Sequence, residues 1–241
     1  MSRFQKKGFE TCSHLIWDET NQDIEDKISK INLQGNRFRS GIPMIYLPEY
    51  TTQNIKNNLD KSFLYDRFSE IRKNHDLVIF HHVRHFWKNV PSNMPEHHKA
   101  NDRLFRAVKQ LKEERPDLRG AMKTFNYGPD AGETKKLVAS LGIEDNVFWF
   151  EKSPRKEIMI GIGLSDIVAG EFKNSYFTYG TVLEAMTMKK VIIHNRKNTE
   201  QYKKTYNELY GMIHAEFQDE IYNGLCLYLD NKDYYENVYK L

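Results

Sequence analysis

A chain of 241 residues with 39% hydrophobic and 13% aromatic side chains can bury one large or two small cores, which excludes an intrinsically disordered protein. The formal net charge of +3 is too small for the concentrated basic stripe of a typical nucleic-acid-binding surface, but it is compatible with an anionic small ligand. Cys12 and Cys226 lie far apart and have no C-x-x-C partner, so neither a disulfide framework nor a zinc ribbon is indicated.

The amino-terminal segment MSRFQKKGFETCSH contains basic residues but lacks the apolar region of a signal peptide. No apolar run reaches the roughly 18 residues that a membrane-spanning helix needs. Together with the cysteine pattern, which is typical of a reducing compartment, these features predict a cytoplasmic protein. Contact with a membrane surface is left open.

The first 75 residues have an irregular pattern. The apolar runs HLIW and MIYLP predict strands at His14–Trp17 and Met44–Pro48. A short helix is expected at Asp23–Ile31, and a further helix at Leu64–Lys73.

From Asp76 onward, short apolar runs alternate with longer amphipathic stretches, which is typical of a parallel sheet covered by helices. The sequence therefore predicts an α/β fold with a doubly wound, Rossmann-like parallel sheet of about five strands. Strands are expected at Asp76–Val83, Gly120–Gly128, Asn146–Phe150, Ser165–Gly170 and Val191–His194, and helices at Asn101–Glu114, Glu133–Leu141, Pro154–Leu164, around Glu184 and at Glu216–Leu229. Ligands of such sheets bind at the carboxyl ends of the strands.

The segment from Ser175 to Asn195 joins a glycine-led helix start to an acidic residue and a buried strand. The backbone N–H groups of Gly180, Thr181 and Val182 are the unpaired donors of a new helix, where the helix dipole favours a phosphate. Glu184 follows one turn later, where its carboxylate can accept hydrogen bonds from ribose hydroxyls. This combination predicts nucleotide binding.

The motifs HHVRHFW, HKAND, YGPD…LGIEDNV, SDIVAG and YGTVLEAM…VII occur in this order, and together they resemble the carboxyl-terminal domain of retaining GT-B glycosyltransferases of group 1 (family 4). The resemblance covers roughly Arg39 to Leu229. It implies a remnant of the amino-terminal domain with the crossover segment at residues 1–42, and a donor-binding Rossmann-like domain at residues 43–241.

The resemblance also implies site residues. Arg84 and Lys99 match the two cations that hold the donor diphosphate and stabilise the leaving group, so they are the expected catalytic residues. In the nucleotide-sugar site, Tyr179, Gly180 and Thr181 would contribute backbone donors, and Glu184 would bind the ribose. Two positions depart from the family pattern: Ala100 follows Lys99 where the family has Gly, and Tyr176 replaces the first Glu of the paired-glutamate motif, with Glu171 nearby but out of register.

The predicted function is the donor-binding half of a retaining glycosyltransferase in polysaccharide biosynthesis. It would transfer sugar from a UDP- or GDP-sugar to a glycan or lipid-linked acceptor, without a cofactor or required metal. A missing amino-terminal domain or a partner chain would supply the acceptor site. One alternative is a non-catalytic nucleotide-binding or interaction module. The other is an epimerase or phosphorylase of the same architecture, and the phosphorylase needs a pyridoxal-binding lysine that the sequence does not reveal.

Other polar residues admit both a functional and an ordinary interpretation. The histidines cluster around the end of the first strand of the predicted domain, at His81, His82, His85, His97 and His98, but this context does not favour the helical pair of a zinc site. Asp130 and Asp166 are expected to cap a turn and to end a helix. Lys152 and Arg155 either approach the nucleotide base or lie in a solvated loop.

Overall fold

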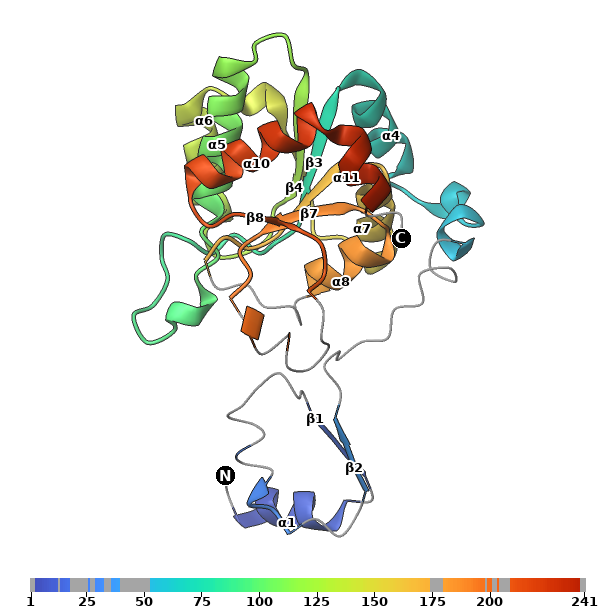
Figure 1. Cartoon of the computed structure of the whole chain (residues 1–241), viewed down its shortest axis with the longest axis vertical. Helices are drawn as coiled ribbons and strands as arrows, with labels where there is room; N and C mark the ends of the chain where they lie inside the picture. Colours follow the sequence, from blue (N-terminus) through green and yellow to red (C-terminus); the bar gives the residue numbers. More distant parts are fainter. Residues whose placement is uncertain are drawn as a thin grey trace. The chain divides into compact units, whose positions relative to one another are not determined.

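The computed structural model describes residues 3–12, 14–17, 26, 29–32, 36–39, 53–173, 180–197, 199–200, 203 and 209–238 (Figure 1). The chain divides into two compact units. The first comprises residues 1–45 and 198–209, and the second comprises residues 46–197 and 210–241.

The first unit contains helix α1 (Arg3–Thr11) and two parallel strands, β1 (His14–Trp17) and β2 (Asn36–Arg39). The predicted strand at His14–Trp17 is confirmed. β2 has the sequence NRFR, which contains no apolar run and was therefore not predicted. Most of the expected helix at Asp23–Ile31 and the whole expected strand at Met44–Pro48 lie outside the described residues.

The second unit is built on a six-stranded parallel sheet in the order β5-β4-β3-β6-β7-β8. Its strands are β3 (Leu77–His81), β4 (Gly120–Phe125), β5 (Val147–Phe150), β6 (Ile167–Ala169), β7 (Val191–His194) and β8 (Ile213–His214). The predicted doubly wound α/β class is confirmed. The five predicted strands of this sheet are present, and β8, which has two residues, is the strand that the sequence did not predict.

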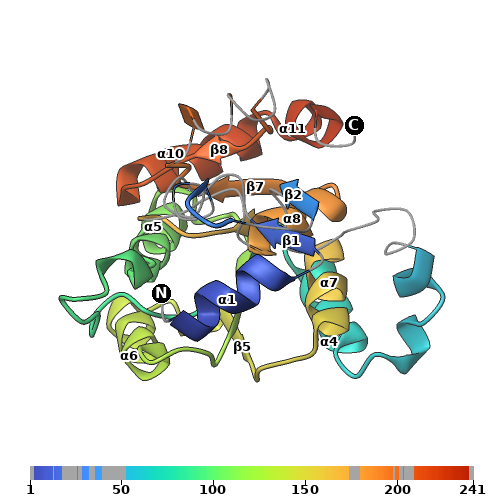
Figure 2. The ribbon, with the colours of Figure 1, turned by 90° about the horizontal axis from the view of Figure 1, so that it is seen from below.

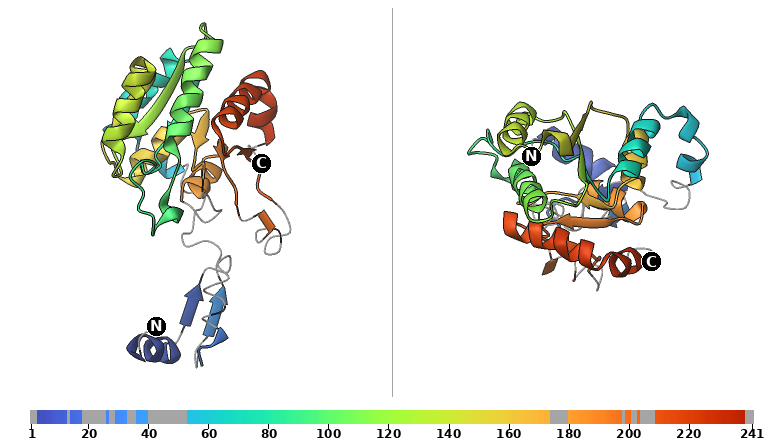
Figure 3. Two further views of the ribbon diagram at one scale, coloured as in Figure 1. Left: turned by 90° about the vertical axis from the view of Figure 1, so that its left-hand side faces the viewer. Right: turned by 90° about the horizontal axis from the view of Figure 1, so that it is seen from above.

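Helices cover both faces of this sheet (Figures 2 and 3). One layer contains α4 (Tyr65–Asn74), α7 (Arg155–Gly163) and α8 (Gly180–Thr187), and the other contains α5 (Asn101–Glu114), α6 (Ala131–Leu141) and α10 (Gln218–Asp230), followed by α11 (Lys232–Val238). Short 3₁₀ turns lie at η1 (Leu59–Lys61), η2 (Pro95–His97) and η3 (Glu144–Asn146). The predicted helix at Leu64–Lys73 is confirmed as α4.

The strands are apolar on both faces because both faces are covered. Leu77 and Ile79 of β3 pack in the core cluster with Leu104 and Phe105 of α5. On the opposite face, Phe80 meets Phe68 of α4 edge to face, with the ring centroids 6.2 Å apart. The alternation of side chains along one strand therefore anchors both helix layers.

α7 lies so close to the sheet that a side chain at Gly161 would collide with the ring of Phe80. Glycine is the residue that allows such a close approach of backbone to side chain. This explains why the apolar stretch EIMIGIG carries a glycine within a helix.

Lys123 of β4 is fully buried in the layer between the sheet and α4. Its Nζ donates a hydrogen bond to the carbonyl oxygen of Leu164 at 2.7 Å and lies 5.0 Å from the ring centroid of Phe68. Burial lowers the pKa of the Lys123 ammonium from 10.5 to about 7. The unfolded chain therefore binds more protons than the folded one between these two values, and stability should rise with pH across that window.

We expect Lys123→Met to remove this pH dependence. Between about pH 7 and pH 9, the free energy of unfolding of the parent protein should rise by roughly 2 kcal/mol relative to that of the variant. Urea unfolding of both proteins at the two pH values measures the difference, and Lys136→Met, which changes an exposed lysine on α6, is the control. Equal pH dependence of parent and Lys123→Met would contradict a buried, titrating ammonium.

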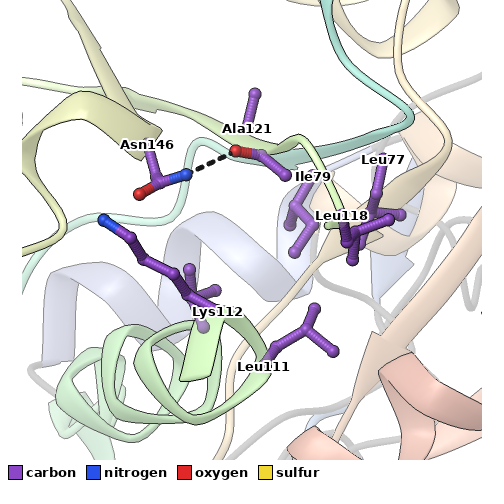
Figure 4. A pocket seen from close by; sticks show the side chains of 9 residues that line it. Leu77, Ile79, Leu111, Lys112, Leu118, Ala121 and Asn146 are labelled. Atoms are coloured by element: carbon purple, nitrogen blue, oxygen red, sulfur yellow. Dashed lines mark hydrogen bonds between the residues drawn. The ribbon is translucent and has the colours of Figure 1, made fainter. Parts of the chain in front are cut away.

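A small cavity lies at the amino ends of β3 and β4, next to α5 (Figure 4). Leu77, Leu111, Ala121 and Asn146 help to line it, and the Asn146 side-chain amide donates a hydrogen bond to the carbonyl oxygen of Gly120 at 2.9 Å. Its volume of about 20 Å³ is room for a single water. It is too small for a nucleotide.

Candidate functional site

The strand order of the second unit reverses between β3 and β6, because β4 and β5 follow on one side of β3 and β6 to β8 on the other. In an open α/β sheet, ligands bind at the carboxyl ends of the strands on either side of such a reversal. The segments that leave β3 at His82 and β6 at Gly170 therefore define the candidate site.

The loop after β3 is held by Asp130, which is fully buried. One carboxylate oxygen of Asp130 accepts hydrogen bonds from the backbone N–H groups of Trp87 at 2.8 Å, Lys88 at 2.8 Å and Asn89 at 3.1 Å. Although burial opposes it, these N–H groups lower the pKa of Asp130. Asp130 stands at the N-cap position of α6 but makes no side-chain cap hydrogen bond there, so the predicted capping role is wrong and the carboxylate fixes the loop instead.

Gly128, in the turn after β4, packs closely against His85 and Arg84 of the same loop. Its φ of +113° lies in a region that side chains disfavour, and a Cβ there would lie 2.6 Å from His85 N and 2.7 Å from Arg84 Cγ. The backbone N–H of His85 donates to the carbonyl oxygen of Tyr127 at 2.8 Å. The turn after β4 therefore positions the backbone that carries Arg84.

Lys99 is fixed by its backbone on two sides. Its N–H donates to the carbonyl oxygen of Phe86 at 2.7 Å, and its carbonyl oxygen accepts from the N–H of Phe172 at 3.1 Å. Ala100 follows in the left-handed conformation with φ 52°. A glycine would adopt this conformation more easily, since the left-handed region is strained for a residue with a Cβ.

Lys99 and Glu171 form a buried ion pair. Lys99 Nζ lies 2.7 Å from Glu171 Oε2, and Lys99 and Glu171 are 7% and 8% exposed. Burial raises the pKa of the Glu171 carboxyl to about 7, although the positive charges of Lys99 and Arg84 act in the opposite direction. Lys99 and Arg84 are linked through Phe86, because the Lys99 N–H donates to the Phe86 carbonyl oxygen and the Arg84 guanidinium lies over the Phe86 ring.

Glu171 was not predicted as a site residue, because it is out of register with the family's glutamate pair. The available signal was its position, one residue after the predicted strand that ends at Gly170 and at the carboxyl edge of the sheet. The structure thus adds an acidic group to the predicted pair of cations.

Arg84 is half-buried, and its side chain contacts Phe86 and His97 in the segment between β3 and α5. Its guanidinium lies 5.3 Å from the ring centroid of Phe86, and Nη2 lies 3.2 Å from Nδ1 of His97. Both contacts restrict the rotamers of a long side chain. Arg84 is therefore oriented before any ligand arrives.

Glu184 lies in the first turns of α8 and is 5% exposed. Its Oε2 accepts from His82 Nε2 at 2.6 Å, and its Oε1 lies 2.8 Å from Arg155 Nη1. A carboxylate offers about four acceptor positions, so these two contacts leave capacity for a ligand hydroxyl. Among the described residues, the buried Nδ1 atom of His82 has no hydrogen-bond partner.

The structure also places most of the remaining residues that the sequence singled out. Gly180 and Thr181 are the first two residues of α8, as the sequence predicted, whereas Tyr179 and Tyr176 lie outside the described residues. Arg155 reaches Glu184, and Lys152 lies over the ring of Tyr127 with Nζ 5.3 Å from its centroid.

His81, at the end of β3, has a structural role. His81 is fully buried, with Nδ1 donating to the carbonyl oxygen of Ala169 at 3.1 Å and Nε2 accepting from the Asn101 side chain at 2.9 Å. Burial lowers the pKa of His81 to about 3, so both ring nitrogens are engaged in a neutral ring. In the part of the chain that the structure describes, no group of three or more His, Cys, Asp or Glu side chains could hold a metal ion.

The sequence matches no protein-family model, and none of the curated proteins matches it. Solved structures do match. A glycosyltransferase from Rickettsia africae ESF-5 is 14% identical, with a TM-score of 0.58 over 100% of this chain and 61% of its own. Anabaena HepE in complex with UDP is 13% identical, with a TM-score of 0.60 over 99% of this chain and 61% of its own.

A third structure is the carboxyl-terminal domain of LpcC, a group 1 glycosyltransferase family protein from Francisella tularensis. It is 14% identical, with a TM-score of 0.50 over 74% of this chain and 88% of its own. This chain therefore spans about 61% of the length of the two longer enzymes, and most of an isolated carboxyl-terminal domain.

None of the described helices is long and apolar enough to cross a bilayer.

The parallel six-stranded sheet, its strand order and the matched structures all indicate the same fold. The chain has the Rossmann-like fold of one half of a group 1 GT-B glycosyltransferase.

Proposed function

We propose that the second unit binds the diphosphate of a nucleotide-sugar and acts as the donor-binding half of a retaining glycosyltransferase. The observation that carries the proposal is that Lys99, paired with buried Glu171, and Arg84 both meet Phe86 in the loop after β3, at the point where the strand order reverses. Fixed cations at this edge are suited to a group that develops negative charge.

In this proposal, the bond between the sugar's anomeric carbon and the diphosphate breaks while an acceptor hydroxyl attacks from the same face, and the acceptor proton passes to the departing phosphate. Arg84 and Lys99 stabilise the charge on the leaving group. The backbone N–H groups of Gly180 and Thr181, with that of Tyr179, add dipolar stabilisation. No metal is needed when the protein supplies these donors.

Glu184 is proposed to accept hydrogen bonds from the ribose. Its carboxylate is buried and already oriented by His82 and Arg155, which reduces the conformational entropy lost on binding.

UDP-sugars are the first donors to test, because the matched structures of Anabaena HepE contain UDP or UDP-glucose. GDP-sugars are the second. The acceptor would be a glycan or a lipid-linked sugar, bound by an amino-terminal domain or a partner chain.

Isothermal titration calorimetry of the full chain with UDP and GDP tests the binding site. We expect Arg84→Ala and Glu184→Ala each to weaken the binding of the preferred nucleotide by about tenfold, because each removes a charged contact. Arg119→Ala is the matched control, since Arg119 is exposed and pairs with Asp76 at the opposite end of β4. Unchanged affinity in both site variants would refute the assignment.

A transfer assay separates catalysis from binding. Sugar transfer by the chain alone, or only after a chain with an acceptor domain is added, supports the transferase. Nucleotide binding with no turnover in either case supports a binding module instead.

A further inference from the structure

A second polar cavity lies at the opposite edge of the sheet, where β6 and β7 begin. It has a volume of about 170 Å³ and is lined by Arg72, Ser165, Asp166, Lys189, Lys190, Val191 and Glu236. Asp166 directly precedes β6 and Val191 opens β7, whereas the nucleotide site proposed above lies at the carboxyl ends of the strands. The two sites therefore lie at opposite ends of the strands.

The carboxylate of Asp166 already has three partners. One oxygen accepts from the backbone N–H of Val78 at 2.8 Å, and the other lies 3.0 Å from Arg72 Nη2 and 3.3 Å from Lys232 Nζ. The expectation that Asp166 merely ends a helix is incomplete, because it ties α4 and α11 to the sheet. It has little capacity left to neutralise another cation.

Lys190 is a further cation in the wall of this cavity. It is half-buried in the cavity wall, and among the described residues no hydrogen bond or ion pair satisfies its ammonium. Burial lowers the pKa of Lys190; Asp166 and Glu236 oppose this shift, and the positive charges of Arg72 and Lys232 add to it. A half-buried ammonium beside other cations is costly unless an anion joins it.

We propose that this cavity binds a phosphate dianion, either free or as a phosphomonoester headgroup, with Lys190 as its central ligand and Arg72 and Lys189 at its rim. Arg72, Lys190 and Lys232 face two carboxylates, Asp166 and Glu236, so the cations outnumber the carboxylates by one before Lys189 is counted. The volume is roughly ten times that needed to hold one water, which admits a phosphate group with some water. Guanidinium and ammonium groups are the usual ligands of phosphate.

Calorimetric titration of the full chain with inorganic phosphate tests this site. The parent protein should bind phosphate, and Lys190→Met should weaken that binding by about tenfold or more, because the charged hydrogen bond is lost while most of the side-chain volume is kept. Lys136→Met, which removes an exposed lysine on α6, should leave it unchanged. Arg84→Ala distinguishes the two edges of the sheet and should also leave this binding intact.

Lys189→Asn provides a second variant that keeps the fold, because Lys189 is exposed and has a φ of 53°, which asparagine tolerates. It should weaken phosphate binding severalfold. Absence of phosphate binding by the parent protein, or loss of it in Arg84→Ala but not in Lys190→Met, would overturn the proposal without affecting the nucleotide site.

Vesicles of phosphatidylcholine with phosphatidic acid distinguish the two sources of the phosphate. Co-sedimentation that depends on Lys190 assigns the cavity to a lipid headgroup, and phosphate binding without co-sedimentation assigns it to a soluble phosphate.

Discussion

Asp130→Ala should lower the free energy of unfolding by about 3 kcal/mol and weaken UDP binding, although Asp130 touches no proposed ligand. The substitution removes the acceptor of three backbone N–H groups and of the Asn89 side chain, which lies 2.6 Å from Oδ1. Hydrogen bonds to a charged acceptor contribute about 1.5–3 kcal/mol each, but this loop is partly exposed, so water replaces some of them. Urea unfolding and calorimetry with UDP measure the two effects.

Two further variants make the result specific to the carboxylate. Asp130→Asn keeps an acceptor oxygen and should lose only part of the stability. Asp117→Ala, at an exposed position near the start of β4, should lose almost none. If Asp130→Ala were as stable as Asp117→Ala, the loop after β3 would not depend on this contact.

The pH dependence offers a second readout. Because the folded pKa of Asp130 is lowered from 3.8, its contribution is present above that value and is lost as the pH falls through the folded pKa. The difference in stability between the parent protein and Asp130→Asn should therefore shrink in acid.

Most of the sheet was predictable because strands such as LVIFH in β3 and VIIH in β7 are apolar runs that stand out from the amphipathic helices between them. β8 has only Ile213 and His214, and its pairing with β7 depends on tertiary context that no local pattern contains. β2 was missed for a related reason, since its letters NRFR carry no strand periodicity.

The places of the proposed site residues in the fold were predictable in part, and their roles in binding stay predictions. Arg84, Lys99, Gly180 and Thr181 lie on the expected elements, because the carboxyl ends of parallel strands meet at one edge of a sheet. The partners of these residues were not predictable. Lys99 meets Glu171 across 72 residues of chain, and Glu184 meets His82 across 102.

Asp130 illustrates why local rules fail here. A carboxylate after Gly-Pro usually caps the following turn, but three backbone donors of a loop 41 to 43 residues earlier compete for it. The loop wins because it offers three backbone donors and the Asn89 side chain to one carboxylate, whereas a helix cap uses one or two.

The affinity of the parent protein for UDP should fall by up to about fifteenfold between pH 7 and pH 8.5, and the Glu171→Gln variant should abolish that dependence. Glu171 holds Lys99 at 2.7 Å, and its folded pKa is about 7. At higher pH the carboxylate is charged, so it both occupies the Lys99 ammonium and repels a diphosphate. At lower pH the neutral acid releases Lys99, so nucleotide binding should be accompanied by proton uptake.

The pH dependence of the free energy of unfolding provides an independent check on the raised pKa of Glu171. The folded pKa of Glu171 is raised from 4.5 to about 7, so the folded state binds more protons than the unfolded chain between these values. The contribution of Glu171 to the free energy of unfolding should therefore fall as the pH rises from 4.5 to about 7, and Glu171→Gln should not show this fall. Urea unfolding at about pH 5 and pH 8 measures it without nucleotide.

The nucleotide also titrates, since a phosphate loses its second proton near pH 6, and for this reason the binding comparison begins at pH 7. Glu113→Gln on α5 is the matched control, because Glu113 is exposed and pairs only with Lys109 among the described residues. Calorimetry in two buffers of different ionisation enthalpy measures the proton uptake directly. If the parent protein, Glu113→Gln and Glu171→Gln all followed the same pH profile, the proton would belong to the nucleotide, and Glu171 would not control access to Lys99.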